Sequence, residues 1–247
     1  MKKIIIALVM VSLSSLAHAA GGKIHLDEAN IDLTDKSSLQ RGAKLFVNYC
    51  MNCHSASFMR YNRMGKDLGI SDKLVADNLI FSDDKVGDPM KVAMTIEDGA
   101  KWFGTPPPDL SVISRAKGSG SVGADWLYTY FRSFYVDESR PFGVNNTVFK
   151  DVGMPHALWE LQGMQKLVNA DEVKASGATP EFALVSTGSM TADEYDTAAR
   201  DLTNFLVYVG EPSKLERLSL GGWVLAFLVF FFFVAYAMKK DYWRDIH

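Results

Sequence analysis

The sequence contains very little cysteine: Cys50 and Cys53 are the only two among its 247 residues. Because one short motif uses both, no cysteine is left for a structural disulfide elsewhere in the chain. A zinc site of the usual kind is also disfavoured, since the sequence has no second Cys-x-x-Cys and no closely spaced histidine pair to complete four ligands.

The sequence also lacks an internal repeat and any run that alternates convincingly with the period of a β-strand. Residues 55–123 and 139–190 are instead broken by turn residues such as Gly87-Asp88-Pro89 and Asn145-Asn146, which predict loops and short helices. A basic excess is missing too: 29 acidic and 26 basic residues give a net charge of −3. This charge argues against nucleic-acid binding and suits a basic partner, although ordinary solubility would explain it equally well.

The two cysteines belong to the stretch Cys50-Met51-Asn52-Cys53-His54. A Cys-x-x-Cys-His motif is typical of covalent attachment of a c-type haem. The thiols add to the haem vinyl groups, and the histidine is a usual proximal ligand of the iron. A redox disulfide of the thioredoxin type would need a βαβ context, which the helical flanks do not predict. The motif therefore predicts one covalent haem c held by Cys50, Cys53 and His54, with His54 as a metal ligand.

The N-terminus has the pattern of an export signal. Lys2-Lys3 precede an apolar run over residues 4–16, and Ala17-His18-Ala19 has the Ala-x-Ala pattern of a cleavage site. The apolar run is short and ends in small residues, which disfavours an uncleaved anchor. We expect residues 1–19 to be a signal peptide and the mature chain to be exported.

A second apolar segment, residues 218–238, contains no charged side chain. A helix needs about 20 apolar residues to cross the hydrocarbon core of a bilayer. Trp223 and Tyr236 lie near its ends, where such rings prefer the interface, and the basic residues that follow suit the cytoplasmic side. A buried core helix fits poorly, because the segment is long and has no polar face. We expect a transmembrane anchor over 218–238 and a cytoplasmic tail over 239–247.

Residues 20–213 are enough for one globular domain, which the two membrane signals assign to the periplasm. Ser37-Ser38-Leu39-Gln40 has the spacing of a capping box, and a helix is expected to run from it into the haem motif. Ala124–Val136 has the pattern of an amphipathic helix. A second capping box at Thr191–Glu194 predicts a helix that ends at Gly210.

Gly42 and Phe46 precede the haem motif at a spacing that resembles the N-terminal helix of class I cytochromes c. In that fold the glycine lets the N-terminal and C-terminal helices cross closely, and an aromatic ring packs over it. Phe205 or Tyr195 could supply the ring. The resemblance implies an all-α class I cytochrome c fold with long loops, to which the anchor adds one C-terminal transmembrane helix.

Within this class the chain resembles the cytochrome c1 family of the quinol–cytochrome c oxidoreductase (bc1) complex. The matching stretches are Arg60-Tyr61, Pro107-Pro108-Asp109-Leu110-Ser111 with Arg115-Ala116, Val152-Gly153-Met154-Pro155, and the anchor followed by Lys239-Lys240. Each stretch is short, but together and in this order they cover most of the chain. The chain cannot form the disulfide that some bacterial relatives have.

The resemblance implies that Met154 is the sixth ligand of the iron, because it lies between a glycine and a proline as in the ligand loop of the family. A thioether ligand gives a high reduction potential and closes the distal site. Met164 and Met190 are the alternatives, and His156 is a conceivable one. The resemblance also implies that Arg115 contacts a haem propionate, unless it is a solvated surface residue, and that Pro108 and Leu110 line the haem edge.

The function implied is that of an electron-transfer subunit without bond chemistry of its own. It would accept electrons from the Rieske iron–sulfur protein and pass them to a soluble or membrane-bound cytochrome c. Its partners would be cytochrome b and the Rieske protein, in a dimeric complex of the bacterial inner membrane. The main alternative is a membrane-anchored monohaem cytochrome c of a terminal oxidase. A haem enzyme or gas sensor with an open distal site is a third class.

Overall fold

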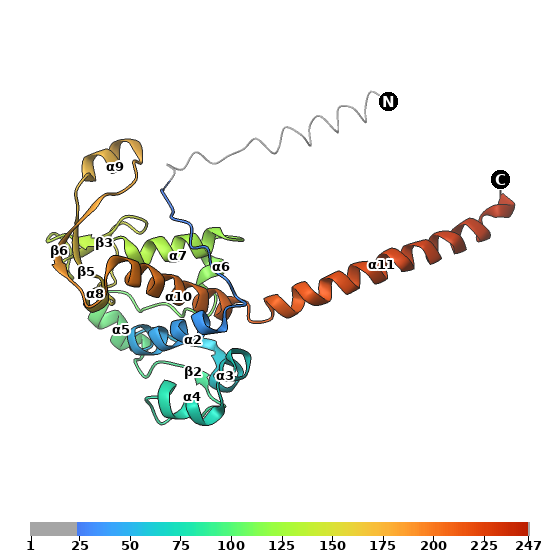
Figure 1. Ribbon diagram of the computed structural model, residues 1–247, viewed down its shortest axis with the longest axis horizontal. Coiled ribbons are helices and arrows are strands. Elements are labelled where there is room, and N and C mark those ends of the chain that lie inside the picture. Colours follow the sequence, from blue (N-terminus) through green and yellow to red (C-terminus); the bar gives the residue numbers. More distant parts are fainter. Residues whose placement is uncertain (1–23, 247) are drawn as a thin grey trace.

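Helices dominate residues 24–246, which are the part of the chain that the computed structural model describes (Figure 1). The expected signal peptide, residues 1–19, lies outside the described residues. The helices are α2 (Lys36–Leu45), a π-helix η2 (Phe46–Cys50), α3 (Tyr61–Leu68), α4 (Asp72–Leu79), α5 (Ile96–Phe103), α6 (Ile113–Ala116), α7 (Val122–Arg132), α8 (Trp159–Gln162), α9 (Ala170–Ser176), α10 (Ala192–Gly210), α11 (Lys214–Tyr242) and a final 3-10 helix η3 (Arg244–Ile246).

Three antiparallel sheets of two strands each accompany these helices. The strand pairs are β1 (Ala56–Arg60) with β2 (Pro89–Met90), β3 (Phe134–Val136) with β4 (Val144–Asn146), and β5 (Gly163–Leu167) with β6 (Phe182–Thr187). The expectation of an all-α fold was therefore incomplete, and most of the strands lie in stretches expected to be loops and short helices. The strands are too short to show a periodic pattern, and in β6 the last four residues are all exposed.

The main helices lie where the sequence predicts them, except at some of their ends. The Asp35 side chain caps α2 by accepting from the Ser38 N–H, so the helix begins before the expected capping box at Ser37. The capping box at Thr191 and Glu194 is confirmed. The helix expected over 124–136 ends at Arg132, because the next residues pair with β4 instead, with Phe134 opposite Asn146.

Helices α2 and α10 cross at Gly42, side by side in Figure 1. A Cβ atom at Gly42 would lie 2.1 Å from the Asp201 carbonyl oxygen and 2.7 Å from the Phe205 Cβ, so only glycine allows this approach. The rings of Phe46 and Phe205 pack with centroids 5.5 Å apart. Arg41 adds a two-pronged ion pair to the buried Asp201, with N–O distances of 2.6 and 2.9 Å. Phe205, rather than Tyr195, thus supplies the expected aromatic contact.

We expect Gly42→Ala to destabilise the domain by about 3 kcal/mol, because the added methyl group must push a backbone carbonyl away. Thermal unfolding of the full chain in detergent, followed by circular dichroism, measures the loss. Gly87→Ala is the matched control, since a Cβ atom there meets no atom within 4 Å. Equal unfolding temperatures for the two variants would contradict the tight crossing.

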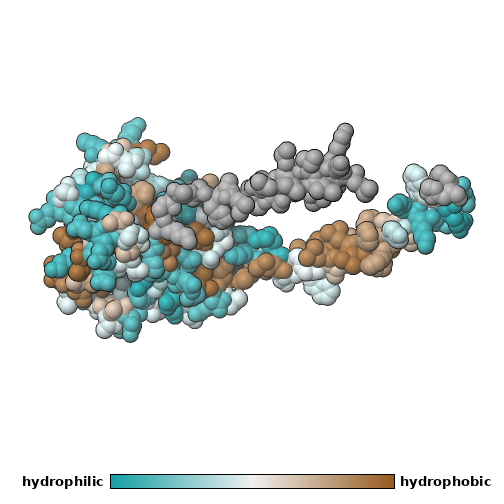
Figure 2. All heavy atoms as spheres, turned by 90° about the horizontal axis from the view of Figure 1, so that it is seen from above, coloured by the Kyte–Doolittle hydropathy of each residue, from teal (hydrophilic) through white to brown (hydrophobic). Residues whose placement is uncertain are grey.

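Helix α11 is long and apolar enough to cross a membrane, and it contains the segment 218–238 expected from the sequence. None of its residues is buried, and in Figure 1 it projects away from the other labelled helices and strands. Figure 2 shows that its apolar stretch ends in hydrophilic residues at the far end. The apolar side chains of α11 therefore need a cover that the described residues do not provide, as expected of an anchor.

Candidate haem-binding site

An apolar pocket of about 410 Å³ lies beside the Cys-x-x-Cys-His motif. Its walls come from the motif, from α7, and from two loops around residues 103–110 and 149–157. Cys50, Cys53, His54 and Met154 all line this one pocket, although Met154 is far from the motif in the sequence. The fold thus brings together the four residues expected to hold a haem.

The last turn before the pocket is a π-helix, which places Cys50 inside and leaves Cys53 half-buried. The two thiols are free, and burial raises the pKa of Cys53 and raises that of Cys50 to about 12. Catalytic Cys-x-x-Cys pairs have a lowered pKa instead, so these cysteines are poor candidates for a redox disulfide. Among residues 24–246 no cluster of three or more His, Cys, Asp or Glu side chains is placed to hold a metal ion.

His54 is oriented by a single hydrogen bond. Its Nδ1–H donates to the Pro108 carbonyl at 2.7 Å, which leaves Nε2 with a free lone pair. Burial lowers the pKa of His54, so the ring is neutral at pH 7, as a metal ligand must be. Fixing a ligating imidazole through its other nitrogen is a common feature of metal sites. The Pro108 carbonyl therefore has a role that the sequence did not suggest.

The loop that carries Pro108 is tied to the residues after the motif. The Leu110 N–H donates to the Ser55 carbonyl, and the Asp109 carboxylate accepts from the Ser57 N–H at 3.0 Å. The Ser111 hydroxyl accepts from the Phe58 N–H at 3.0 Å. These bonds explain the run Pro-Asp-Leu-Ser in physical terms: Asp and Ser fasten the loop, while Pro108 and Leu110 line the pocket as expected.

Met154 is the only methionine that lines this pocket among the described residues. Met190 lines a different cavity, and Met164 lies on β5. His156 is buried outside the pocket lining, where its ring stacks on Phe134 with centroids 4.8 Å apart. The geometry therefore favours Met154 over each alternative considered from the sequence.

Arg115 does not line the pocket; it is exposed on α6. The cation that lines the pocket is Lys117, whose Nζ lies 4.2 Å from the centroid of the Trp126 ring and 4.9 Å from that of Phe149. The sequence analysis missed Lys117, Trp126 and Tyr130. The amphipathic pattern of α7 could have indicated the two aromatic residues, since they share one helix face.

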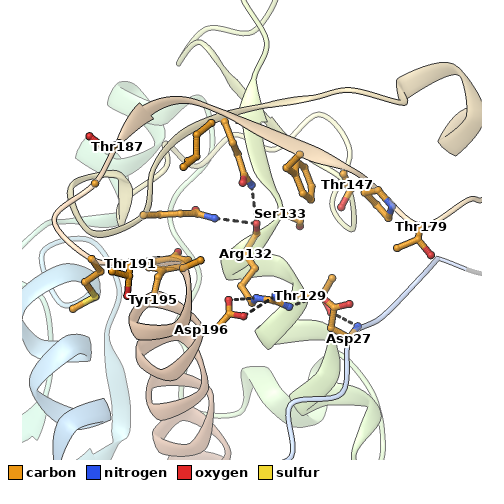
Figure 3. A pocket seen from close by; sticks show the side chains of 18 of the residues that line it. Asp27, Thr129, Arg132, Ser133, Thr147, Thr179, Thr187, Thr191, Tyr195 and Asp196 are labelled. Atoms are coloured by element: carbon orange, nitrogen blue, oxygen red, sulfur yellow. Dashed lines mark hydrogen bonds and ion pairs between the residues drawn. The ribbon is translucent and has the colours of Figure 1, made fainter.

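A second cavity, of about 660 Å³, lies on the opposite face of α7 and is lined mostly by polar and charged residues (Figure 3). Arg132 is held there between Asp196 and Asp27, so its charge is already paired. Gln165 donates to the Arg132 carbonyl from the side of β5. The lining of this cavity contains no cysteine, and the Cys-x-x-Cys-His motif lies at the first pocket instead.

The arrangement of the first pocket fits a covalent haem c: two free thiols, a neutral imidazole with a free Nε2, and a thioether surround an apolar space. Ligand pockets in proteins have this apolar character with few polar groups.

Comparisons with known proteins agree with the geometry. The family model of the cytochrome c1 family matches residues 27–246. The chain is 49% identical to cytochrome c1 of Allochromatium vinosum over the full length of both chains. It is 47% identical to a protein of Nitrosomonas europaea named ammonia monooxygenase gamma subunit, over 94% of this chain and 93% of that one. Cytochrome c1 of Blastochloris viridis is 26% identical over 86% of this chain and 82% of its own length. With the Cys-x-x-Cys-His pocket and this match over most of its length, the chain belongs to the cytochrome c1 family.

Proposed function

We propose that this chain is the electron-transfer subunit of a respiratory quinol–cytochrome c oxidoreductase and that it carries one covalent haem c. The observation that supports this most is the single apolar pocket that His54, Met154 and both cysteines of the motif line. The haem, when bound, supplies a one-electron couple.

The residues of the chain bind, orient and enclose that group. Cys50 and Cys53 would attach it, and His54 would bind the iron through Nε2 while its Nδ1–H stays on the Pro108 carbonyl. Met154 would supply the second protein ligand of the iron, which would leave no open site for a substrate. The aromatic and proline side chains exclude water, so that little has to rearrange when the charge changes. No residue of the pocket needs to move a proton, and the chain does no bond chemistry itself.

We expect the mature chain to carry one haem that survives acid–acetone extraction, because both thiols of the motif form thioethers. Intact-mass spectrometry should show the mass of the chain plus one haem. Cys50→Ala and Cys53→Ala should each weaken attachment, and the double variant should lose all acid-stable haem. A haem that is extracted from the unaltered chain, or a second added haem, would contradict the assignment.

For the propionates we assign the main cation to Lys117, which lines the pocket, while the role of Arg115 stays a prediction. A positive charge beside the haem favours the reduced form, because the electron is attracted to it. We therefore expect Lys117→Gln to lower the reduction potential more than Arg115→Gln does. Potentiometric titration of the two matched variants decides between them, and a larger effect at Arg115 would restore the original assignment.

The partners and the orientation are also proposals. Cytochrome b and the Rieske protein would surround the chain in a dimeric complex, with the haem domain in the periplasm, the C-terminus in the cytoplasm, and a cytochrome c as acceptor. The span of α11 and the basic residues after it support this orientation. Purification in mild detergent with subunit identification tests it. Co-purification with a terminal oxidase, or with an ammonia-oxidising enzyme as the name of one relative would suggest, would overturn it.

A further inference from the structure

Besides lining the haem pocket, the Tyr130 side chain makes one specific hydrogen bond. Its hydroxyl donates to the Sδ atom of Met154 at 3.3 Å. Among the described residues the hydroxyl has no other hydrogen-bond partner. Tyr130 is 8% exposed and lines the pocket, so water does not compete freely for the donor. The contact joins helix α7 directly to the loop that carries the expected ligand.

The position of Tyr130 is fixed from several sides. Its ring stacks on Trp126 with centroids 5.0 Å apart and meets the edge of Phe134 at 5.0 Å. Its carbonyl accepts a hydrogen bond from the Asn146 side chain at 2.9 Å, which fastens the end of α7 to β4. A hydroxyl on a ring held in this way keeps its direction without a further ordering cost.

The chemistry of sulfur gives this contact a consequence. A thioether has two lone pairs, so one can accept from Tyr130 while the other remains for the iron. Donation of a hydrogen bond draws electron density from the sulfur, which makes it a weaker donor to ferric iron. The positive end of the O–H dipole also points toward the site. Both effects disfavour the oxidised state, so both raise the reduction potential.

We propose that Tyr130 is a positioning residue that holds the Met154 thioether by a hydrogen bond and thereby raises the reduction potential of the site. The inference rests on the proposed function, because it requires Met154 to be the sixth ligand. It adds Tyr130, on helix α7, to the residues that set the reduction potential. This residue lies outside both the Cys-x-x-Cys-His motif and the loop that carries Met154.

The test is a potentiometric titration of Tyr130→Phe in the full chain with its haem. The variant keeps the ring and removes only the donor. At a fixed ambient potential we expect the ratio of reduced to oxidised haem to fall about threefold to tenfold, the usual weight of one hydrogen bond. The weak red absorption band of sulfur-ligated ferric haem should persist. Tyr128→Phe is the matched control on the same helix, since its hydroxyl contacts Arg200 and not Met154; its ratio should stay unchanged.

A double-mutant cycle separates this effect from a general loss of packing. In a Met154→Leu background the acceptor is gone, so Tyr130→Phe should cause little further shift. An equal shift in both backgrounds would overturn the inference, because Tyr130 would then act without the sulfur. If Tyr130→Phe does not accumulate, a fluorinated tyrosine at position 130 serves instead: its more acidic hydroxyl donates more strongly, so the potential should rise, and no rise overturns the inference.

The outcomes for the inference and for the proposed function differ. If Met154→Leu loses the red band while Tyr130→Phe leaves the potential unchanged, the ligand assignment stands and the inference fails. If Met154→Leu keeps the band, Met154 is not the sixth ligand, and the ligand assignment and the inference fail together.

Discussion

Replacing Met154 with leucine is expected to leave the haem covalently attached and to lower its reduction potential by hundreds of millivolts. Leucine keeps the apolar volume but cannot bind iron, and the thioether stabilises ferrous more than ferric haem. Axial ligands span about 0.8 V in reduction potential, so the loss of one ligand falls well within that range. The vacant position should also admit carbon monoxide to the reduced haem, which the unaltered chain should bind hardly at all.

Spectroelectrochemical titration and a reduced-minus-CO spectrum measure both effects. Met190→Leu is the matched control, because Met190 lines the second cavity, on the other face of α7. It should keep the potential and the red absorption band of the unaltered chain. If Met154→Leu keeps them and Met164→Leu or Met190→Leu loses them, the ligand is that methionine. Strong CO binding by the unaltered chain would favour a haem enzyme or gas sensor instead.

The residues expected to hold the haem could be picked out from the sequence because covalent attachment fixes the spacing of the motif. Cys50, Cys53 and His54 form one motif, and a family resemblance indicated Met154; all four line one pocket. The cation that lines the pocket was harder to predict. Arg115 and Lys117 are two positions apart on and just after a short helix, and the helical turn decides which of them lines the pocket. A sequence pattern does not resolve that difference.

The part of the fold that is built from long helices could be predicted from the sequence. Gly42 and Phe205 indicated the crossing of α2 and α10, and the contact is present. The strands were missed because their stability comes from pairing rather than from their own pattern. At the end of α7, Phe134 continues the apolar periodicity of the helix, yet it pairs with Asn146, whose side chain also holds the Tyr130 carbonyl. Tertiary contacts of this kind override local propensity.

Removing the anchor is expected to separate the two roles of the chain. A mature chain that stops after Pro212 should fold, because α11 has no buried residue. The main tie across the cut is the exposed ion pair between Arg217 and Glu211, and such pairs contribute about 0–1 kcal/mol. The shortened chain should therefore be soluble and haem-loaded, and it should still exchange electrons with a cytochrome c.

The same shortened chain should fail to support quinol oxidation in membranes, since it no longer remains next to cytochrome b. Oxidation of quinol by membranes, and the subunits that co-purify with the haem domain, are the two measurements. The full-length chain expressed in the same strain is the control for both. A shortened chain without haem would mean that attachment depends on the anchor, and that the haem domain does not fold and mature independently of it.

The anchor could pack against cytochrome b or act only as a tether. Substitution among the small residues Gly221, Gly222 and Ala226 distinguishes these two cases. Helices in lipid pack closely through small residues, although glycine is also common in membrane helices without such a role. Gly222→Leu, in an otherwise intact anchor, should loosen association with cytochrome b if α11 packs against it. Val229→Leu is the control, because it leaves the small residues unchanged. If the chain that stops after Pro212 still co-purifies stoichiometrically with cytochrome b, α11 is a tether only, and the haem domain alone holds the complex together.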